Sequence, residues 1–427
     1  MLEEIKSPRI GEKCYRYIHS SGVTVCLCPM ESYSTVNAQF AVRFGSEDSS
    51  FRVNGENISI PDGTAHYMEH KLFDSEEKDA FAQFAETGAS CNAGTSYDST
   101  CYYFSCADNF ARNLEILLDF VQHPYFTPEN VEKERGIIGQ EITMYQDSPS
   151  WRVLMELLKG VYQVNPIRTD IAGTIESISE ITDKTLYDVY NAFYDPSNMF
   201  ISIAGNFDMD EAIAVIDRCL LKKTPQPLEL IPVSEPHDVA QHRTELNMPV
   251  AKPQFAIGFK RPDADGQPAL DEYVYLNMVL DILFGDTSDF FKRMRDSGAV
   301  NDTFRVSVFM GRGYVLPLAT GESDDPDAVF EEMKKEIRRF KENPPDKDIF
   351  DCIKKSTYGS VVRGYNSTSA VAQYMMDAAL AGLPPYSLVE TAADASYEEM
   401  CSRLMSLEEE NSCISIIYPL DSEGAAE

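Results

Sequence analysis

Two histidines and a glutamate lie within one short stretch, residues 65–74 (AHYMEHKLFD), which contains the pattern His-x-x-Glu-His. On an α-helix, positions i and i+4 lie on one face about one turn apart, so His66 and His70 can hold one zinc ion between them. Glu69 lies beside the same site and suits a general base that takes a proton from a zinc-bound water. The order is the reverse of His-Glu-x-x-His and occurs among zinc peptidases. The stretch therefore predicts a helix that carries a metal site.

The alternative is that so short a pattern arises by chance, as happens in many long chains. Two observations favour the metal site. The chain has 6 His, and two of them fall here. The flanking residues also suit a helix, because residues 61–64 (PDGT) offer capping side chains and Leu72 and Phe73 offer apolar anchors.

A second helix is predicted from Thr127-Pro128 onward, with Pro at its first position. Glu134 and Glu141 are two helical turns apart and so share a face of it. A catalytic zinc needs a third protein ligand, which Glu141 can supply, while Glu134 can orient the site from behind the ligands. The competing interpretation is a solvated acidic helix face.

Residues 13–45 predict three strands, followed by a polar loop at 46–60. After the metal helix, Ser75 is predicted to cap a helix that ends at Gly88. Residues 88–96 (GASCNAGTS) then predict a strand of small side chains, which includes Asn92 and Ala93. Such a strand is either an ordinary sheet edge or a place where a substrate adds as a further strand, and both remain open.

Composition limits the class of protein. A chain of 427 residues with 43% hydrophobic and 25% charged residues is typical of a globular protein of two domains. The net charge of −32 argues against nucleic-acid binding. No apolar run reaches the roughly 18 residues of a membrane span, and the N-terminus resembles no signal peptide. The scattered cysteines suggest reduced thiols, so we expect a cytoplasmic protein.

The second half repeats the first weakly. Residues 222–253 hold six Pro and mark a linker, so we expect an N-terminal domain at 1–225, a linker at 226–250 and a C-terminal domain at 251–427. By the Leu-Phe register of the two halves, His66, Glu69 and His70 correspond to Asn277, Leu280 and Asp281, and by the Pro register Glu141 corresponds to Tyr358. The second half is therefore expected to repeat the architecture without the metal ligands.

Taken together, residues 66–70 (HYMEH), Asn92-Ala93 on the following strand, and the pair Glu134 and Glu141 resemble the insulinase/pitrilysin (inverzincin) family of zinc metallopeptidases. The resemblance covers both halves of the chain. Residues 70–73 (HKLF) and 136–141 (GIIGQE) resemble a bacterial two-domain branch that is similar to mitochondrial processing peptidase subunits.

The resemblance implies an α+β fold of two homologous α/β-sandwich repeats, each a mostly antiparallel sheet packed by helices. It implies that Zn²⁺ is bound by His66, His70 and Glu141, that Glu69 is the general base and that Glu134 supports the site. It also implies that the strand around Asn92 and Ala93 binds the backbone of a peptide substrate. Four such domains would enclose a chamber, so a two-domain chain would have to dimerise.

One departure from the family concerns the second half, where active members place an Arg followed by a Tyr that hold the substrate near the zinc. Arg295 matches the Arg, but Asn301 or Asp302 stands where the Tyr is expected. This resembles the zinc-bearing subunit of a heterodimer whose partner lacks the zinc motif. We therefore expect a zinc endopeptidase acting on unfolded peptides. The alternatives are a non-catalytic binding or assembly subunit of the same fold and, third, an enzyme that modifies a protein side chain.

Overall fold

The computed structural model describes residues 2–76, 78–223, 226–261 and 270–420. The chain forms two compact units that interleave along the sequence. Unit 1 contains residues 1–142, 170–232 and 361–388, and unit 2 contains residues 143–169, 233–360 and 389–427. The predicted division into 1–225, 226–250 and 251–427 concerns repeats along the sequence, whereas the two units are groups of residues that pack together in space. The predicted domain boundaries therefore stay a prediction.

Unit 1 is built on a seven-stranded sheet in the order β1-β2-β3-β9-β4-β8-β7. All neighbouring strands are antiparallel except β3 and β9, which are parallel. Strand β7 lies at one edge. The strands are β1 (Glu3–Lys6), β2 (Lys13–Ile18), β3 (Thr24–Pro29), β4 (Val36–Val42), β7 (Ser90–Thr95), β8 (Thr100–Cys106) and β9 (Met199–Gly205). A small sheet in the order β10-β5-β6 is formed by β5 (Ser50–Val53), β6 (Glu56–Ser59) and β10 (Leu228–Leu230).

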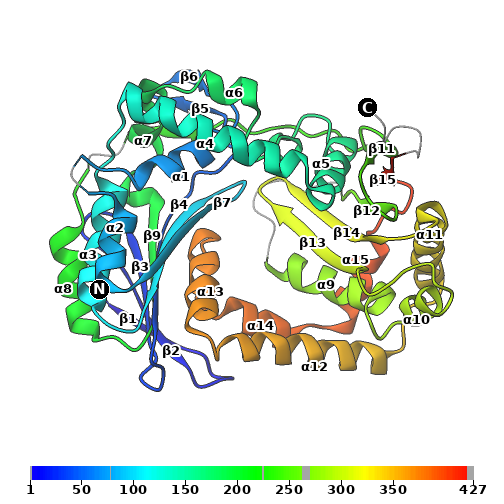
Figure 1. Cartoon of the computed structure of the whole chain (residues 1–427). Helices are drawn as coiled ribbons and strands as arrows, with labels where there is room; N and C mark the ends of the chain where they lie inside the picture. Colours follow the sequence, from blue (N-terminus) through cyan, green and yellow to red (C-terminus); the bar gives the residue numbers. More distant parts are fainter. Residues whose placement is uncertain (1, 77, 224–225, 262–269, 421–427) are drawn as a thin grey trace. The chain divides into compact units, whose positions relative to one another are not determined.

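Helices cover both faces of the seven-stranded sheet (Figure 1). Helices α1 and α3 contact the strands from one face, and α13, which comes from far along the chain, contacts β3, β4 and β9 from the other. The helices that lie wholly or mostly in unit 1 are α1 (Thr64–Leu72), α2 (Ala80–Thr87), α3 (Phe110–Gln122), α4 (Pro128–Gln146), α6 (Ile175–Ser179), α7 (Asp183–Phe193), the short η2 (Pro196–Asn198), α8 (Met209–Cys219) and α13 (Thr368–Leu380).

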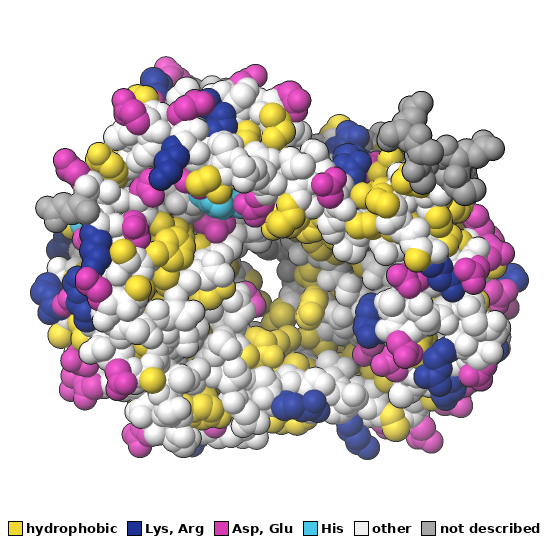
Figure 2. Space-filling model, in the orientation of Figure 1, with side chains coloured by type: hydrophobic (Ala, Val, Ile, Leu, Met, Phe, Trp, Pro, Cys, Tyr) yellow, Lys and Arg dark blue, Asp and Glu magenta, His cyan; other side chains and the backbone are white. Residues whose placement is uncertain are grey.

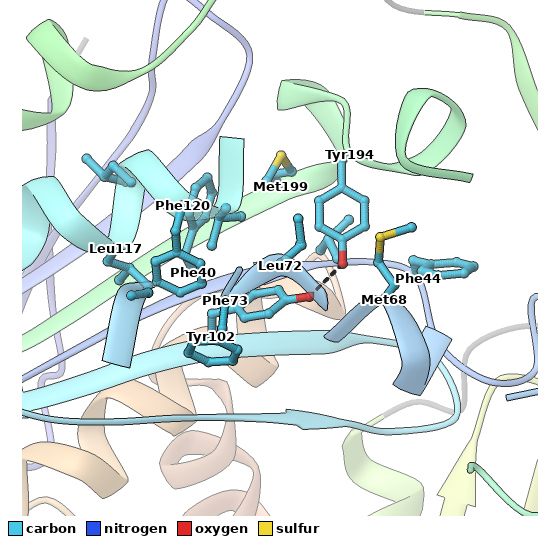
Figure 3. Close-up of a cluster of buried hydrophobic side chains, with 14 of the residues drawn as sticks. Phe40, Phe44, Met68, Leu72, Phe73, Tyr102, Leu117, Phe120, Tyr194 and Met199 are labelled. Carbon is cyan, nitrogen blue, oxygen red and sulfur yellow. Dashed lines mark hydrogen bonds between the residues drawn. The ribbon is translucent and has the colours of Figure 1, made fainter. Parts of the chain in front are cut away.

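The apolar core of unit 1 lies between the sheet and α1. Strand β4 sends Ala38 and Phe40 into it, as the alternation of side chains along a strand requires, and α1 contributes Leu72. The hydroxyl groups of Tyr102 and Tyr194 are buried in this core and satisfy each other through a hydrogen bond of 2.9 Å (Figure 3). The core therefore holds α1, which is the predicted metal helix, against the sheet.

Unit 2 is built on a five-stranded sheet in the order β11-β15-β12-β14-β13, in which only β11 and β15 are parallel. Its strands are β11 (Arg243–Met248), β12 (Gln254–Phe259), β13 (Arg305–Gly311), β14 (Tyr314–Glu322) and β15 (Ser412–Pro419). Its helices are α5 (Pro149–Val161), η1 (Pro166–Arg168), α9 (Leu270–Phe284), α10 (Asp289–Asp296), α11 (Pro326–Glu342), most of α12 (Lys347–Gly364) and of α14 (Ser387–Asp394), and α15 (Tyr397–Met405).

The α+β fold class predicted from the sequence is confirmed, as are the strands at 13–45 and the strand at 88–96. Two local predictions are wrong. The expected loop at 46–60 contains β5 and β6, and the helix after the metal helix is capped by Asp79, whose side chain accepts a hydrogen bond from the backbone N–H of Ala82, rather than by Ser75. In the described part of the chain, no helix combines the length and apolar character that a membrane crossing requires.

Candidate metal centre

Helix α1 starts at a position that only glycine fits. Gly63, at the N-terminal cap, has a φ of +89°, and a Cβ built there would lie 2.5 Å from the carbonyl oxygen of Ala172. An L-residue is therefore strained at this position both by conformation and by contact. The first helical residue, Thr64, donates a hydrogen bond of 2.6 Å from its hydroxyl to the carbonyl of Pro61. Together these contacts fix where the helix begins, and so which way His66 and His70 project.

Helix α4 lies against α1 and supplies the two glutamates. Its apolar residues Val131, Ile138 and Ile142 are buried in the core of unit 1. The hydroxyl of Tyr67, on α1, donates a hydrogen bond to the carbonyl of Val131 and so joins the two helices directly. The competing interpretation, a solvated acidic helix face, is therefore wrong for the side of α4 that carries Glu134, since that side faces α1.

His66, His70 and Glu141 come together as predicted. One ligand atom from each lies within 4.8 Å of the others. The distance from His70 Nε2 to Glu141 Oε2 is 3.4 Å, and that from His66 Nε2 to Glu141 Oε1 is 3.7 Å. Two donors that each lie 2.0–2.1 Å from a tetrahedral zinc ion are about 3.3 Å apart. The three side chains are therefore close to the spacing that zinc needs, and their nitrogen and oxygen donors are those that zinc accepts.

The two imidazoles differ in charge state. Burial, together with the neighbouring His70, lowers the pKa of His66 to about 4. Its 3.7 Å contact with Glu141 is therefore not an ion pair at neutral pH. Burial also acts to lower the pKa of His70, but hydrogen bonds to Glu134 and Glu141 outweigh it and raise that pKa to about 9. Without a metal, the site thus holds one neutral and one protonated histidine.

Glu134 lies behind His70 rather than among the ligands. Its Oε1 accepts a hydrogen bond of 3.0 Å from Nδ1 of His70, which leaves Nε2 directed toward Glu141. Its Oε2 lies 3.8 Å from the ammonium of Lys71, a side chain that is 1% exposed and also pairs with Asp74. Burial acts to raise the pKa of Glu134, but the contacts with His70 and Lys71 lower it overall. The carboxylate is therefore held ionised and can orient the imidazole. It lies behind His70, where the sequence analysis expects it from its two-turn spacing to Glu141.

Glu69 points to a different neighbour. Its Oε2 accepts a hydrogen bond of 2.6 Å from the hydroxyl of Thr95, the last residue of the edge strand β7. Burial raises the pKa of Glu69, and the bond from Thr95 offsets part of that rise. A carboxylate with a raised pKa accepts a proton more readily, as a general base requires.

The predicted substrate residues divide between the units. Asn92 and Ala93 lie on β7, whose partner on one side is β8 and which forms no ladder on the other side within the described chain. Arg295 lies on α10 in unit 2, where its guanidinium packs over the ring of Phe291. Asn301, at the position expected for Tyr, donates a hydrogen bond of 3.1 Å to Glu322.

Two residues of the site were not identified from the sequence. Lys71 follows His70 directly and, as a lysine, would be expected at the surface. Thr95 lies on the small-residue strand and could have been found from alternation along it, because Ala93 and Thr95 share one face. Neither residue belongs to the pattern of metal-ligating side chains that the sequence analysis used.

The site is reached from solvent, although it is largely buried. The side chains of His70 and Glu141 are each 23% exposed. Acidic side chains are spread widely over the face of the molecule that Figure 2 shows, consistent with the net charge of −32.

Comparison with known proteins finds two matching family models. Residues 56–175 match the model described as insulinase (peptidase family M16), and residues 180–357 match that of the peptidase M16 inactive domain. A Bacillus subtilis (strain 168) protein named uncharacterized zinc protease YmfH is 34% identical over 94% of this chain and 95% of its own length. A crystal structure described as that of an M16-like peptidase from Alicyclobacillus acidocaldarius has a TM-score of 0.93 at 34% identity and covers 97% of this chain and 100% of that one. An Arabidopsis thaliana protein named probable mitochondrial-processing peptidase subunit beta is 26% identical over 46% of this chain and 39% of its own length.

Proposed function

Because the chain belongs to the insulinase family of peptidases (family M16), we propose that it is a zinc-dependent endopeptidase that cleaves unfolded peptides. The observation that carries the proposal is the convergence of His66, His70 and Glu141 at 3.4–3.7 Å, beside a buried Glu69. A scaffold has no need for a basic carboxylate next to three metal donors.

In this mechanism His66, His70 and Glu141 would hold the zinc ion, and Glu134 would keep Nε2 of His70 directed at it. When bound, the ion would polarise the scissile carbonyl and lower the pKa of water to about 7. Glu69 would take the proton of the attacking water and pass it to the leaving amine. Its hydrogen bond to Thr95 would fix the direction of the carboxylate during both transfers.

The edge strand β7 would place the peptide. An extended peptide could add to its free edge through main-chain hydrogen bonds, beside Asn92 and Ala93. Because Thr95 belongs to β7 and contacts Glu69, the same strand would fix the position of the scissile bond relative to Glu69. Arg295 is proposed to hold the substrate, as the family resemblance implies.

We further propose that the active form is a dimer, in which a partner chain closes the chamber around the peptide. The partner is a second copy or a zinc-lacking homologue that supplies the missing Tyr. Support comes from Asn301 at the expected Tyr position and from a relative that is named as a subunit. Ten free cysteines support a reducing compartment such as the cytoplasm.

The test combines metal analysis with cleavage of a quenched fluorescent peptide, with and without candidate partner chains. Glu69→Gln is expected to retain zinc and lose cleavage, and His70→Ala is expected to lose both. Glu132→Gln, on the exposed side of α4, is the matched control and is expected to keep both. Undiminished cleavage by Glu69→Gln would refute the mechanism.

The second candidate function is a binding or assembly subunit that cleaves nothing, which Asn301 at the Tyr position favours. It predicts peptide binding without cleavage, whichever partner is added. Mass spectrometry of the peptides distinguishes the three functions. A peptidase yields shortened peptides, a binding subunit leaves them unchanged, and a modifying enzyme changes the mass of an intact peptide.

A further inference from the structure

The two histidines of the metal centre differ in what supports them. Nδ1 of His70 donates a hydrogen bond of 3.0 Å to Glu134, which leaves its Nε2 directed toward Glu141. Nε2 of His66 likewise lies 3.7 Å from Glu141, but Nδ1 of His66 is buried and has no hydrogen-bond partner among the described residues. Buried polar atoms are almost always paired, so this nitrogen needs an explanation.

Metal binding makes the unpaired nitrogen more important. A histidine that binds a metal through Nε2 carries its ring hydrogen on Nδ1, and that N–H almost always donates to a carboxylate, a backbone carbonyl or a water. The acceptor fixes the orientation of the ring and makes the ligating nitrogen more basic. Glu134 can do this for His70. His66 therefore needs an acceptor of its own, on the side of its ring that faces away from Glu141.

The segment that begins at Asp170 packs against the start of α1, and both belong to unit 1. The carbonyl oxygen of Ala172 comes so close to the helix cap that a Cβ built at Gly63 would lie 2.5 Å from it. Asp170 is fixed relative to this contact, because its Oδ1 accepts a hydrogen bond of 3.0 Å from the backbone N–H of Ala172. His66 lies three residues beyond Gly63, in the first turn of α1. The side chain of Asp170 is therefore held near the turn that carries His66.

The charge of Asp170 acts on His66. Burial and the neighbouring His70 lower the pKa of His66, and three carboxylates oppose this. Glu141 has the largest opposing effect and Asp170 the next, ahead of Glu134. Asp170 thus acts on this ring more strongly than the carboxylate that supports the neighbouring ring. Because the interaction between charges weakens with distance, Asp170 lies close to His66.

We propose that Asp170 is a positioning residue of the metal centre, which accepts the Nδ1–H of metal-bound His66 and so holds Nε2 toward the ion. The inference rests on the proposed function, because it requires zinc at the site. The carboxylate can accept this hydrogen bond in addition to the one from Ala172, since its two oxygens offer about four acceptor positions. In metal-free His66 the ring hydrogen can instead lie on Nε2, beside Glu141, and Nδ1 then has nothing to donate. Each histidine of the centre would be backed by one carboxylate from outside the ligand set.

Asp170→Asn tests the proposal because it keeps the turn and removes the acceptor. The one side-chain oxygen of Asn can still accept the N–H of Ala172, which leaves the amide NH₂, a donor, where His66 needs an acceptor. The metal-free variant is therefore expected to keep the melting temperature of the unaltered chain. Its zinc affinity, measured by competition with a chelator at neutral pH, is expected to fall about 10- to 100-fold.

Nuclear magnetic resonance reports the hydrogen bond itself, which a merely structural role of Asp170 would not affect. In the zinc-loaded chain with ¹⁵N-labelled histidine, the Nδ1 proton of His66 is expected to resonate downfield and to exchange slowly with water, as in a short hydrogen bond to a carboxylate. Asp170→Asn should move this signal upfield and leave the corresponding signal of His70 in place. Glu134→Gln should do the opposite, which assigns the two signals.

Asp208→Asn is the matched control. Asp208 also accepts a backbone N–H, that of Glu211 at 2.8 Å, at the cap of α8. Its replacement should leave the zinc affinity and both signals unchanged. A zinc affinity of Asp170→Asn within about twofold of the unaltered chain, or a His66 signal that does not move, overturns the inference. If Asp170→Asn lowers the melting temperature, the position of the His66 signal alone decides.

Cleavage of the quenched peptide by the unaltered chain tests the proposed function separately. Zinc binding that depends on Asp170, without cleavage, would refute the peptidase and leave the role of Asp170 standing. Cleavage together with an unchanged zinc affinity in Asp170→Asn would do the reverse. An unaltered chain that binds no zinc would refute both.

Discussion

Zinc binding to this chain should depend steeply on pH, because one of the three proposed ligands is protonated in the metal-free protein. The pKa of His70 is raised to about 9, while that of His66 is lowered to about 4. A histidine binds zinc only in its neutral form, so the proton of His70 must leave. At pH 7, removing this proton costs about 2.7 kcal/mol, which weakens the apparent zinc affinity roughly 100-fold relative to a chain in which His70 is fully neutral.

The expected signature is one proton released per zinc at pH 6. There His70 is almost fully protonated, His66 is neutral, and a zinc-bound water of pKa about 7 contributes only about a tenth of a proton. Titration calorimetry in buffers of different ionisation enthalpy counts the protons. Competition with a chelator of known pH dependence should show the zinc association constant rising about tenfold per pH unit from 6 to 8.

Glu134→Gln tests the cause. Glutamine can still accept the hydrogen bond from His70 but lacks the negative charge that raises the pKa of His70, so the affinity should become less dependent on pH above 7. Glu132→Gln, two residues away on the exposed side of α4, should behave as the unaltered chain. An affinity that does not change between pH 6 and 8, or two protons released at pH 6, would refute the assignment of charge to the two histidines.

Three further changes test the frame that holds the site. Tyr102→Phe and Tyr194→Phe should each lower the free energy of unfolding by about 1–3 kcal/mol, because each leaves a buried hydroxyl unpaired, and the double variant should lose less than the sum in urea unfolding. Gly63→Ala should lower the melting temperature and the zinc content together, because the added Cβ would lie 2.5 Å from the carbonyl oxygen of Ala172. Gly136→Ala, whose Cβ would meet no atom within 4 Å, should instead raise the free energy of unfolding by about 0.5–1 kcal/mol. Lys71→Met should cost about 2 kcal/mol by removing one of the two cations beside Glu134, less than for a fully buried pair because Glu134 is 14% exposed and keeps its hydrogen bond to His70, and Lys71→Arg should restore part of it.

The proximity of His66 to His70, and the shared helix face of Glu134 and Glu141, could be predicted from the sequence because each pair lies at helical spacing. His66 and His70 are one turn apart on α1, and Glu134 and Glu141 are two turns apart on α4, so the periodicity of one helix fixes which side chains share a face. The strands of residues 13–45 were predictable in the same way from alternation. In these cases a local pattern determines the geometry.

Local signals were also overlooked. The expected loop at 46–60 is a hairpin whose turn is Asn54-Gly55, both with positive φ. This dipeptide is a strong hairpin signal, but the flanking residues are too polar to read as strands at first sight.

Other parts of the site depend on contacts between distant segments, which no local pattern encodes. Lys71 is buried because α4 brings Glu134 over it. Helix α13 packs on the unit 1 sheet although it lies more than 160 residues beyond β9, so the contact between Gln39 and Gln373 could not be anticipated. The hydrogen bond from Thr95 to Glu69 likewise depends on how β7 is positioned relative to α1.

Two glutamates of the centre, Glu134 and Glu69, show how one residue type is given different properties by its surroundings. Glu134 lies beside two cations, which lower its pKa and keep it ionised as an acceptor for His70. Glu69 is buried against Thr95, and burial outweighs both the hydrogen bond from Thr95 and the charge of His70, so its pKa is raised and its tendency to accept a proton is greater. Environments that separate the pKa values of neighbouring carboxylates are typical of sites where one acts as a base and the other orients. Because Glu69 accepts a hydrogen bond from Thr95 of the edge strand, a peptide that adds to β7 would be positioned beside this proposed base by the same strand that binds it. Binding and chemistry would then be coupled through a single hydrogen bond of 2.6 Å.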